Sequence, residues 1–169
     1  MNMKKLNIAL VAHDSRKHEL KDWCTHNAQW LDSHNLYATG TTARMLSSIT
    51  ILNDTSKLPE GTATMDWCER GLVVRPLLSG PLGGDQQIGA MLAEGKIDVL
   101  IFFCDNLITQ GHQQDVGALT RLAALYNIAF ATNRTTADMI ITSPLITDES
   151  YVMEVPPVID EYRNRNLNR

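Results

Sequence analysis

The chain has little of what marks several large classes of protein. It contains only three cysteines, Cys24, Cys68 and Cys104, which are odd in number and widely spaced, so neither a disulfide framework nor a paired zinc site is indicated. Its 15 lysine and arginine residues are outnumbered by 19 acidic residues, and the net charge of −4 gives no bulk attraction to nucleic acid or to a membrane surface. No apolar run reaches the roughly 20 residues that a membrane-spanning helix needs.

Two nucleotide-binding signatures are also missing. The chain lacks the phosphate-loop pattern G-x-x-x-x-G-K-[ST], and no G-x-G-x-x-G sits between a predicted strand and a helix. The first residues pass into a strand-like segment without the apolar region of a signal peptide. We therefore expect a cytoplasmic protein with free or buried thiols and with neither a nucleic acid nor a membrane as partner. The composition, 44% hydrophobic and 20% charged, is that of an ordinary globular domain.

Apolar segments alternate with amphipathic ones along the chain. This alternation predicts an α/β fold with a doubly wound, mostly parallel five-stranded sheet in a three-layer α/β/α arrangement. We expect one domain over residues 1–169, with an irregular excursion at 53–71 and a probable insertion at about 52–72. The predicted strands are 7–12, 36–38, 72–78, 98–103 and 128–131, and the predicted helices are 15–34, 43–52, 85–95, one from about 113, and 135–142. Ser15 is expected to cap the first helix, and His18, His26 and His34 to be exposed on it.

The most informative segment is the glycine-rich turn after the third predicted strand. Ser79 and Gly80 follow the apolar run, and Gly83 and Gly84 precede Asp85 at the start of a helix. A strand, a turn with few side chains and a helix N-terminus together make an anion site, because unpaired backbone N–H groups point outward there. A carboxylate in such a turn would compete with a bound anion. Asp85 therefore either caps the helix or meets a neutral, proton-bearing part of a phosphorylated substrate.

Other polar side chains follow the remaining strands, and ligands of such sheets bind beyond the carboxyl ends of the strands. Two chemistries could use them: a divalent metal site, or acids and bases for proton transfer next to a carbonyl. His112 and Asp115 could chelate on one helical turn, but no two histidines have metal spacing, which favours proton transfer. The candidate groups at this edge are Thr39, Gly40, Thr41, Thr42, Ser79, Gly80 and Lys17 as phosphate donors, and His13, His112, Asp85, Asp105 and Asp115 as acids and bases.

Together these segments resemble the methylglyoxal synthase family. The resemblance is carried, in order, by IALVAHD at 8–14 with Lys17, LYATGTT at 36–42, LSGPLGGDQQ at 78–87, EGKIDVLIFF at 94–103 with Asp105, His112 and Asp115, ATN at 131–133 and TAD at 136–138. It implies conversion of dihydroxyacetone phosphate to methylglyoxal and inorganic phosphate, without a metal or an organic cofactor. It also implies a homo-oligomer, commonly a hexamer, that phosphate inhibits. The alternative is a regulatory module of the same fold that binds a phosphorylated effector.

The resemblance also assigns roles to residues. Asp85 would be the catalytic base, His112 would move a proton between two substrate oxygens, and Asp115 would support this transfer with Asp105 nearby. His13 would line the site, and Arg165 could reach the phosphate pocket of a neighbouring subunit. The phosphate would be held by Lys17, Thr39, Gly40, Thr41, Thr42, Ser79 and Gly80. Two departures from the family pattern are Ala43, where a glycine usually stands, and the lack of proline between Asn106 and Gln114.

Overall fold

A five-stranded parallel sheet forms the centre of the molecule. The computed structural model describes residues 4–51, 70–107 and 113–165. The strands are β1 (Asn7–Ala12), β2 (Asn35–Ala38), β5 (Val74–Pro76), β6 (Val99–Phe103) and β7 (Ala129–Ala131). Their order is β5-β2-β1-β6-β7, and every neighbouring pair is parallel. The doubly wound sheet predicted from the sequence is confirmed, and its order reverses between β1 and β6, where such folds bind ligands.

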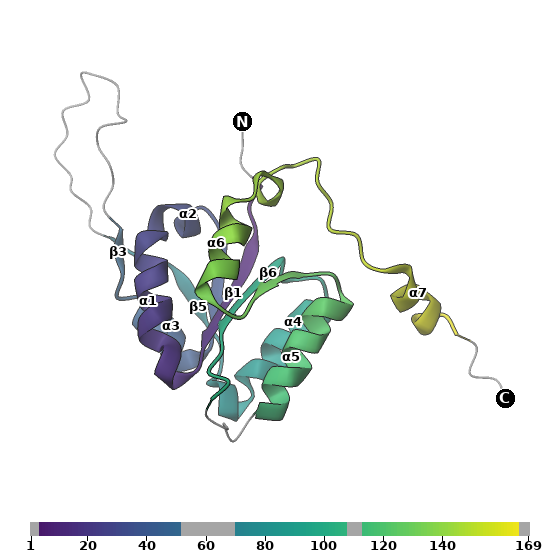
Figure 1. Cartoon of the computed structure of the whole chain (residues 1–169), viewed down its shortest axis with the longest axis horizontal. Coiled ribbons are helices and arrows are strands. Elements are labelled where there is room, and N and C mark those ends of the chain that lie inside the picture. Colours follow the sequence, from purple (N-terminus) through teal and green to yellow (C-terminus); the bar gives the residue numbers. More distant parts are fainter. Residues whose placement is uncertain (1–3, 52–69, 108–112, 166–169) are drawn as a thin grey trace.

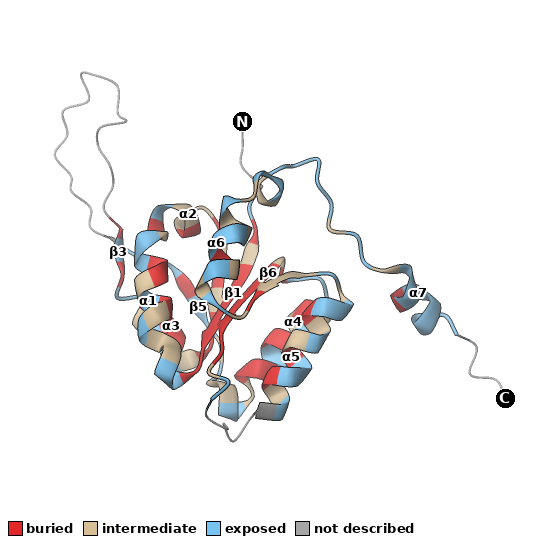
Figure 2. Cartoon of the chain, in the orientation of Figure 1, coloured by how far each residue is buried: buried red, intermediate tan, exposed pale blue. Residues whose placement is uncertain are grey.

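Helices cover both faces of this sheet (Figure 1). Side chains alternate along β1, so Ile8 and Leu10 pack on one face and Ala9 and Val11 on the other. The first face carries α1 (Lys17–His26), α2 (Ala28–Asp32), α3 (Gly40–Leu46) and α6 (Arg134–Thr142), and the second carries α4 (Gly84–Ala93) and α5 (Gln113–Leu125). Figure 2 shows the buried residues concentrated on the strands and on the inward sides of these helices. The three predicted layers are therefore present.

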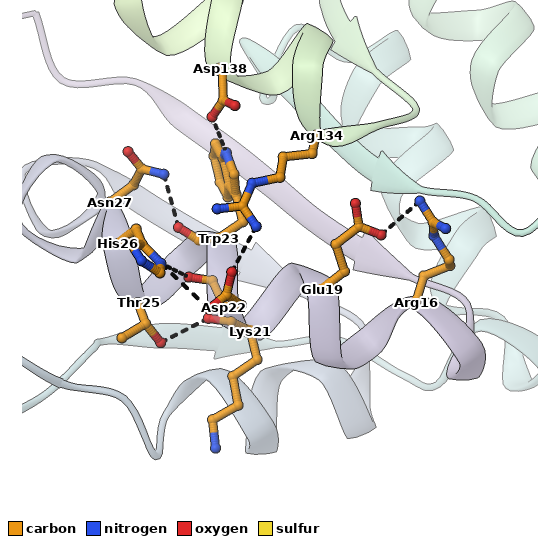
Figure 3. Close-up of polar contacts among 10 residues, drawn as sticks. All are labelled: Arg16, Glu19, Lys21, Asp22, Trp23, Thr25, His26, Asn27, Arg134 and Asp138. Atoms are coloured by element: carbon orange, nitrogen blue, oxygen red, sulfur yellow. Dashed lines mark hydrogen bonds and ion pairs between the residues drawn. The ribbon is translucent and has the colours of Figure 1, made fainter.

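Polar contacts join α1 to α6 on the first face (Figure 3). The buried Trp23 donates its indole N–H to Asp138 Oδ1 at 2.7 Å, which satisfies the one polar atom of that side chain. Beside it, Arg134 Nη1 lies 2.7 Å from Asp22 Oδ2, and this hydrogen bond lowers the pKa of Asp22. These contacts fix the orientation of α1, whose first residue is Lys17.

The first predicted helix is divided in three. A 3₁₀ turn at Asp14–Arg16 precedes α1, and α2 follows after Asn27. Ser15 caps nothing here: its hydroxyl donates to Asp105 Oδ2, and the N-cap residue of α1 is Arg16, without a side-chain cap. The hydrogen bond to Asp105, in a distant loop, overrode the local capping preference of Ser15.

The helix and strands on either side of residues 53–71 also differ from the prediction. The second predicted helix begins earlier, at Gly40, and ends at Leu46, and strand β5 is shorter than the predicted 72–78. Two short strands that were not predicted, β3 (Thr50–Ile51) and β4 (Arg70–Gly71), pair antiparallel outside the main sheet. Residues 52–69 lie outside the described part of the chain. Because β3 and β4 bring Ile51 beside Arg70, we propose that the segment between them is an insertion in a single domain.

The chain ends in an arm that leads away from the sheet (Figure 1). A 3₁₀ turn at Pro144–Ile146 is followed by an irregular stretch and by α7 (Pro157–Arg163), which the sequence pattern did not predict. Several large apolar side chains of the arm are exposed, among them Val152 and Tyr162. None of the helices in the described residues combines the length and the apolar character that crossing a bilayer demands.

The expectation that His34 is exposed was wrong. Its side chain is only 5% exposed, and its Nδ1 accepts a hydrogen bond of 3.3 Å from the backbone N–H of Leu6. The ring also packs edge-on against Trp30, with 4.3 Å between the ring centroids. Burial lowers the pKa of His34, Lys5 lowers it further, and Asp98 opposes both effects.

We expect His34 to make stability depend on pH. The unfolded imidazole binds a proton near its ordinary pKa of 6.5, whereas the folded one does so only at lower pH, so the free energy of unfolding should fall as the pH drops from 7 through 6.5. Urea unfolding at pH 7.5 and 5.5 measures this loss. His34→Gln, which keeps an acceptor but does not titrate, should show a smaller loss than the wild type. The exposed control His18→Gln should keep the wild-type loss; equal losses in all three proteins would contradict the assignment.

Candidate functional site

A pocket of about 680 Å³ lies where the strands end. Its walls come from the ends of β1 and β6, from the residues that follow β1, β2 and β5, and from the first turn of α5, so the sheet topology brings most of them together. The lining residues are Val11, Ala12, His13, Asp14, Lys17, Thr39, Thr41, Ser79, Gly80, Pro81, Asp85, Phe102 and Asp115. Eight of the predicted site residues are among them: His13, Lys17, Thr39, Thr41, Ser79, Gly80, Asp85 and Asp115.

Hydroxyl groups and a cation gather on one side of the pocket. Thr39 and Ser79 are the N-cap residues of α3 and of a 3₁₀ turn, Gly80–Leu82, and neither side chain makes a cap hydrogen bond. The Ser79 hydroxyl and the Gly80 N–H can therefore serve an anion in the pocket. Lys17 Nζ donates to Thr41 Oγ1 at 2.7 Å and pairs with Asp14. This side of the pocket is suited to a phosphoryl group.

Two of the predicted phosphate ligands, Thr42 and Gly40, lie behind the pocket lining. Thr42 is fully buried and accepts a hydrogen bond of 3.3 Å from the Thr39 hydroxyl, so it orients Thr39 from behind. The Gly40 amide donates to the Leu78 carbonyl at 3.2 Å. A Cβ on Gly40 would lie 3.2 Å from Ser79 Oγ, so the lack of a side chain lets the two turns approach each other.

Two glycines place Asp85. Gly83 has a φ of +105°, a conformation that side chains rarely adopt, and a Cβ on Gly84 would lie 2.0 Å from the Leu78 carbonyl oxygen. The N-terminus of α4 consequently packs directly on the backbone that leads from β5. Asp85, in the first turn of α4, is only 3% exposed and lines the pocket. A buried carboxylate thus shares one pocket with the groups that suit a phosphoryl group.

His13 is held in one orientation and one tautomer. Its Nδ1 accepts the backbone N–H of Asp105 at 2.8 Å, so a neutral His13 carries its proton on Nε2 and can act as a donor there. The ring packs edge-on against Phe102, at 5.2 Å between centroids. Asp105 accepts hydrogen bonds from Ser15 and from the Leu107 amide, and it lies behind His13 rather than in the pocket lining.

Asp115 and His112 are the remaining predicted acid and base. Asp115, in the first turn of α5, lines the pocket. His112 lies outside the described residues. Asn133, which follows the edge strand β7, caps α6 by accepting the Thr136 amide at 2.9 Å and does not line the pocket. Five lining residues lie outside the predicted site set. Asp14 directly follows β1, where the strand-end rule places ligand-capable side chains, whereas Val11, Ala12, Pro81 and Phe102 are apolar and gave no signal.

The described cysteines are buried and free, as expected. Burial raises the pKa of both Cys24 and Cys104, that of Cys104 to about 11 against the opposing charge of Arg16. Cys68 lies outside the described residues. Within residues 4–51, 70–107 and 113–165, histidine, cysteine and acidic side chains form no group of three that could hold a metal ion.

Comparisons with known proteins agree with this geometry. A family model described as an MGS-like domain matches residues 60–132. Methylglyoxal synthase from Vibrio campbellii is 47% identical over 150 residues, covering 89% of this chain and 85% of the relative, and that from Proteus mirabilis is 48% identical over 146 residues, covering 86% and 83%. The crystal structure of methylglyoxal synthase from Elizabethkingia anophelis superposes with a TM-score of 0.76 at 38% identity, covering 96% of this chain and 93% of that one. The chain belongs to the methylglyoxal synthase family.

Proposed function

We propose that the protein is a carbon–oxygen lyase that converts dihydroxyacetone phosphate to methylglyoxal and inorganic phosphate. The observation that carries this proposal is the position of Asp85, a buried carboxylate in the same pocket as Lys17, Thr39 and Ser79. A site that only held phosphate would gain nothing from a carboxylate there, since the two anions repel each other. The relatives carry the name of an enzyme, which favours catalysis over the regulatory module.

The first step is removal of a proton next to the carbonyl. Asp85 accepts a proton from the hydroxymethyl carbon, and the electron pair moves toward the carbonyl oxygen. His13 Nε2–H is a neutral donor in the pocket and stabilises the negative oxygen that develops. Triosephosphate isomerase, a general example of the same chemistry, also combines a carboxylate base with a neutral histidine.

The second step separates this reaction from isomerisation. A proton moves from the hydroxyl oxygen to the former carbonyl oxygen, which leaves the negative charge on the first of these oxygens. That charge then expels the phosphate as the bond between carbon and the phosphate oxygen breaks. That bond must stand perpendicular to the plane of the enediolate, because only then does it overlap with the electrons that expel it. Thr39, Thr41, Ser79 and Lys17 hold the phosphoryl group in this orientation and stabilise the departing anion. The released enol becomes methylglyoxal.

Family resemblance supports the remaining roles. His112, which directly precedes α5 in the chain, moves the proton between the two substrate oxygens, and Asp115 assists from the first turn of α5. Asp105 acts through His13, because the backbone N–H of Asp105 sets the tautomer of the His13 ring.

Family resemblance likewise supports a cytoplasmic homo-oligomer, hexameric in the family, that phosphate inhibits. The exposed apolar side chains of the arm, Val152, Val155, Val158 and Tyr162, are consistent with contact between subunits. Arg165 lies over the Tyr162 ring on this arm, at 3.7 Å from the ring centroid, and is absent from the lining of the pocket described here. It would therefore act in the pocket of a neighbouring subunit.

The purified protein incubated with dihydroxyacetone phosphate tests the function. We expect methylglyoxal and inorganic phosphate to appear in equal amounts, and exhaustive treatment with a chelator to leave the rate unchanged, because proton transfer by Asp85 and the histidines needs no metal. Binding without turnover would instead support the regulatory module. A rate that the chelator abolishes and added metal restores would support a metal enzyme.

A further inference from the structure

Three of the segments that line the pocket meet at one peptide. The N-terminus of α3 supplies Thr39 and Thr41, the turn after β5 supplies Ser79 and Gly80, and α4 supplies Asp85. Leu78 lies at their junction: its carbonyl accepts the Gly40 amide at 3.2 Å, and Gly84 packs against the same carbonyl. Any shift of Leu78 therefore changes the position of the phosphate donors relative to the carboxylate.

The amide of Leu78 is held by a side chain. Gln87 Oε1 accepts this N–H at 2.8 Å, although Leu78 and Gln87 are nine residues apart. Gln87 lies on α4, in the turn that follows Asp85, while Leu78 directly precedes Ser79. The bond consequently joins the helix of the proton-accepting group to the strand end that carries the phosphate donors. Backbone bonds from Leu82 and Gly84 to the Ser79 carbonyl shape the turn itself, but they do not reach Leu78.

We propose that Gln87 is a positioning residue that fixes the position of Asp85 relative to the phosphate-binding turns. This inference rests on the proposed function. The substrate offers a phosphoryl group at one end and the proton to be removed at the other, so both halves of the pocket must be correctly placed at once. The binding of a ligand that occupies only the phosphate half does not depend on where Asp85 lies relative to the phosphate-binding turns.

Gln87→Met and Gln87→Glu test the proposal, with Gln86→Met as the matched control. Methionine keeps the length of the side chain but removes the acceptor, whereas glutamate retains one. Gln86 is also exposed on the same helix, and it is not the residue that accepts the Leu78 N–H. For Gln87→Met we expect kcat to fall about tenfold with KM within about threefold, since small misplacements in a reacting pair are costly. Gln87→Glu and Gln86→Met should stay within about threefold of the wild-type kcat.

Calorimetric titrations give a measurement that does not depend on turnover. The probes are inorganic phosphate and 2-phosphoglycolate, an unreactive molecule that joins a phosphoryl group to a planar carboxylate and so spans both halves of the pocket. Gln87→Met should weaken 2-phosphoglycolate about tenfold and leave the Kd of phosphate within about twofold. An equal loss for both probes, an equal loss in Gln86→Met, or no loss at all would overturn the proposal. A wild type that produces no methylglyoxal would overturn the proposed function instead, while the two titrations would still decide the role of Gln87.

Discussion

Asp85→Asn is expected to lower turnover about 10³-fold or more while phosphate still binds. The amide is nearly the same size as the carboxylate, so the pocket keeps its shape, but it cannot accept the proton from the substrate, and general-base catalysis contributes up to about 10⁴-fold. Asp85 is buried, so replacing its charge with a neutral group should not weaken the fold. Steady-state kinetics gives the loss of kcat, and calorimetric titration with phosphate gives the binding.

The control is Glu94→Gln at the other end of the same helix. Glu94 pairs with Lys96 on the surface, far from the pocket lining, and its variant should keep wild-type turnover. If Asp85→Asn retained turnover within tenfold of the wild type, Asp85 would not be the base. If it lost phosphate binding as well as turnover, its role would be to shape the site.

Gly84→Ala should be the most damaging single-methyl change in the described chain. The added Cβ would lie 2.0 Å from the Leu78 carbonyl oxygen, a backbone atom that cannot rotate away. Either α4 or the end of β5 must move, and such overpacking typically costs up to about 3 kcal/mol in the free energy of unfolding. The same movement carries Asp85 away from the phosphate donors, so we expect turnover to fall about 100-fold. Urea unfolding and kinetics measure the two effects.

Gly117→Ala in α5 is the comparison. Apart from the backbone of its own helix and its chain neighbours, no atom of the described residues lies within 4 Å of the Cβ that this change would add, so alanine should stabilise the helix by about 0.5–1 kcal/mol and leave turnover unchanged. Normal stability and turnover in Gly84→Ala would show that the backbone at Leu78 yields easily, and the account of how α4 is placed would then be wrong.

The sequence predicted the sheet well because its central strands, β1 and β6, are buried on both faces. Strand 7–12 is apolar after Asn7, and the structure has β1 at these residues. The site could be anticipated for a related reason: polar residues directly after apolar runs must lie at the same edge of a parallel sheet. His13, Thr39 and Ser79, which follow three different strands and are far apart in the chain, accordingly line one pocket.

The misses depend on contacts that no local pattern encodes. In the sequence, His34 is a polar residue near the end of a predicted helix, yet in the structure it is buried and accepts a hydrogen bond from the Leu6 amide. Ser15 has the right position for a cap but bonds to Asp105, 90 residues away. Gln87 gives no sign of its bond to Leu78, because an exposed glutamine on a helix is usually solvated.

The short antiparallel pair of β3 and β4 has a practical consequence. It fixes the two ends of the 52–69 segment to each other, independently of the five-stranded sheet. Closing a longer chain between fixed ends costs only about 0.6 kcal/mol for each doubling of its length. Foreign peptides of very different size could therefore be grafted there, which makes the protein a candidate scaffold for displaying sequences while its chemistry serves as the reporter of correct folding.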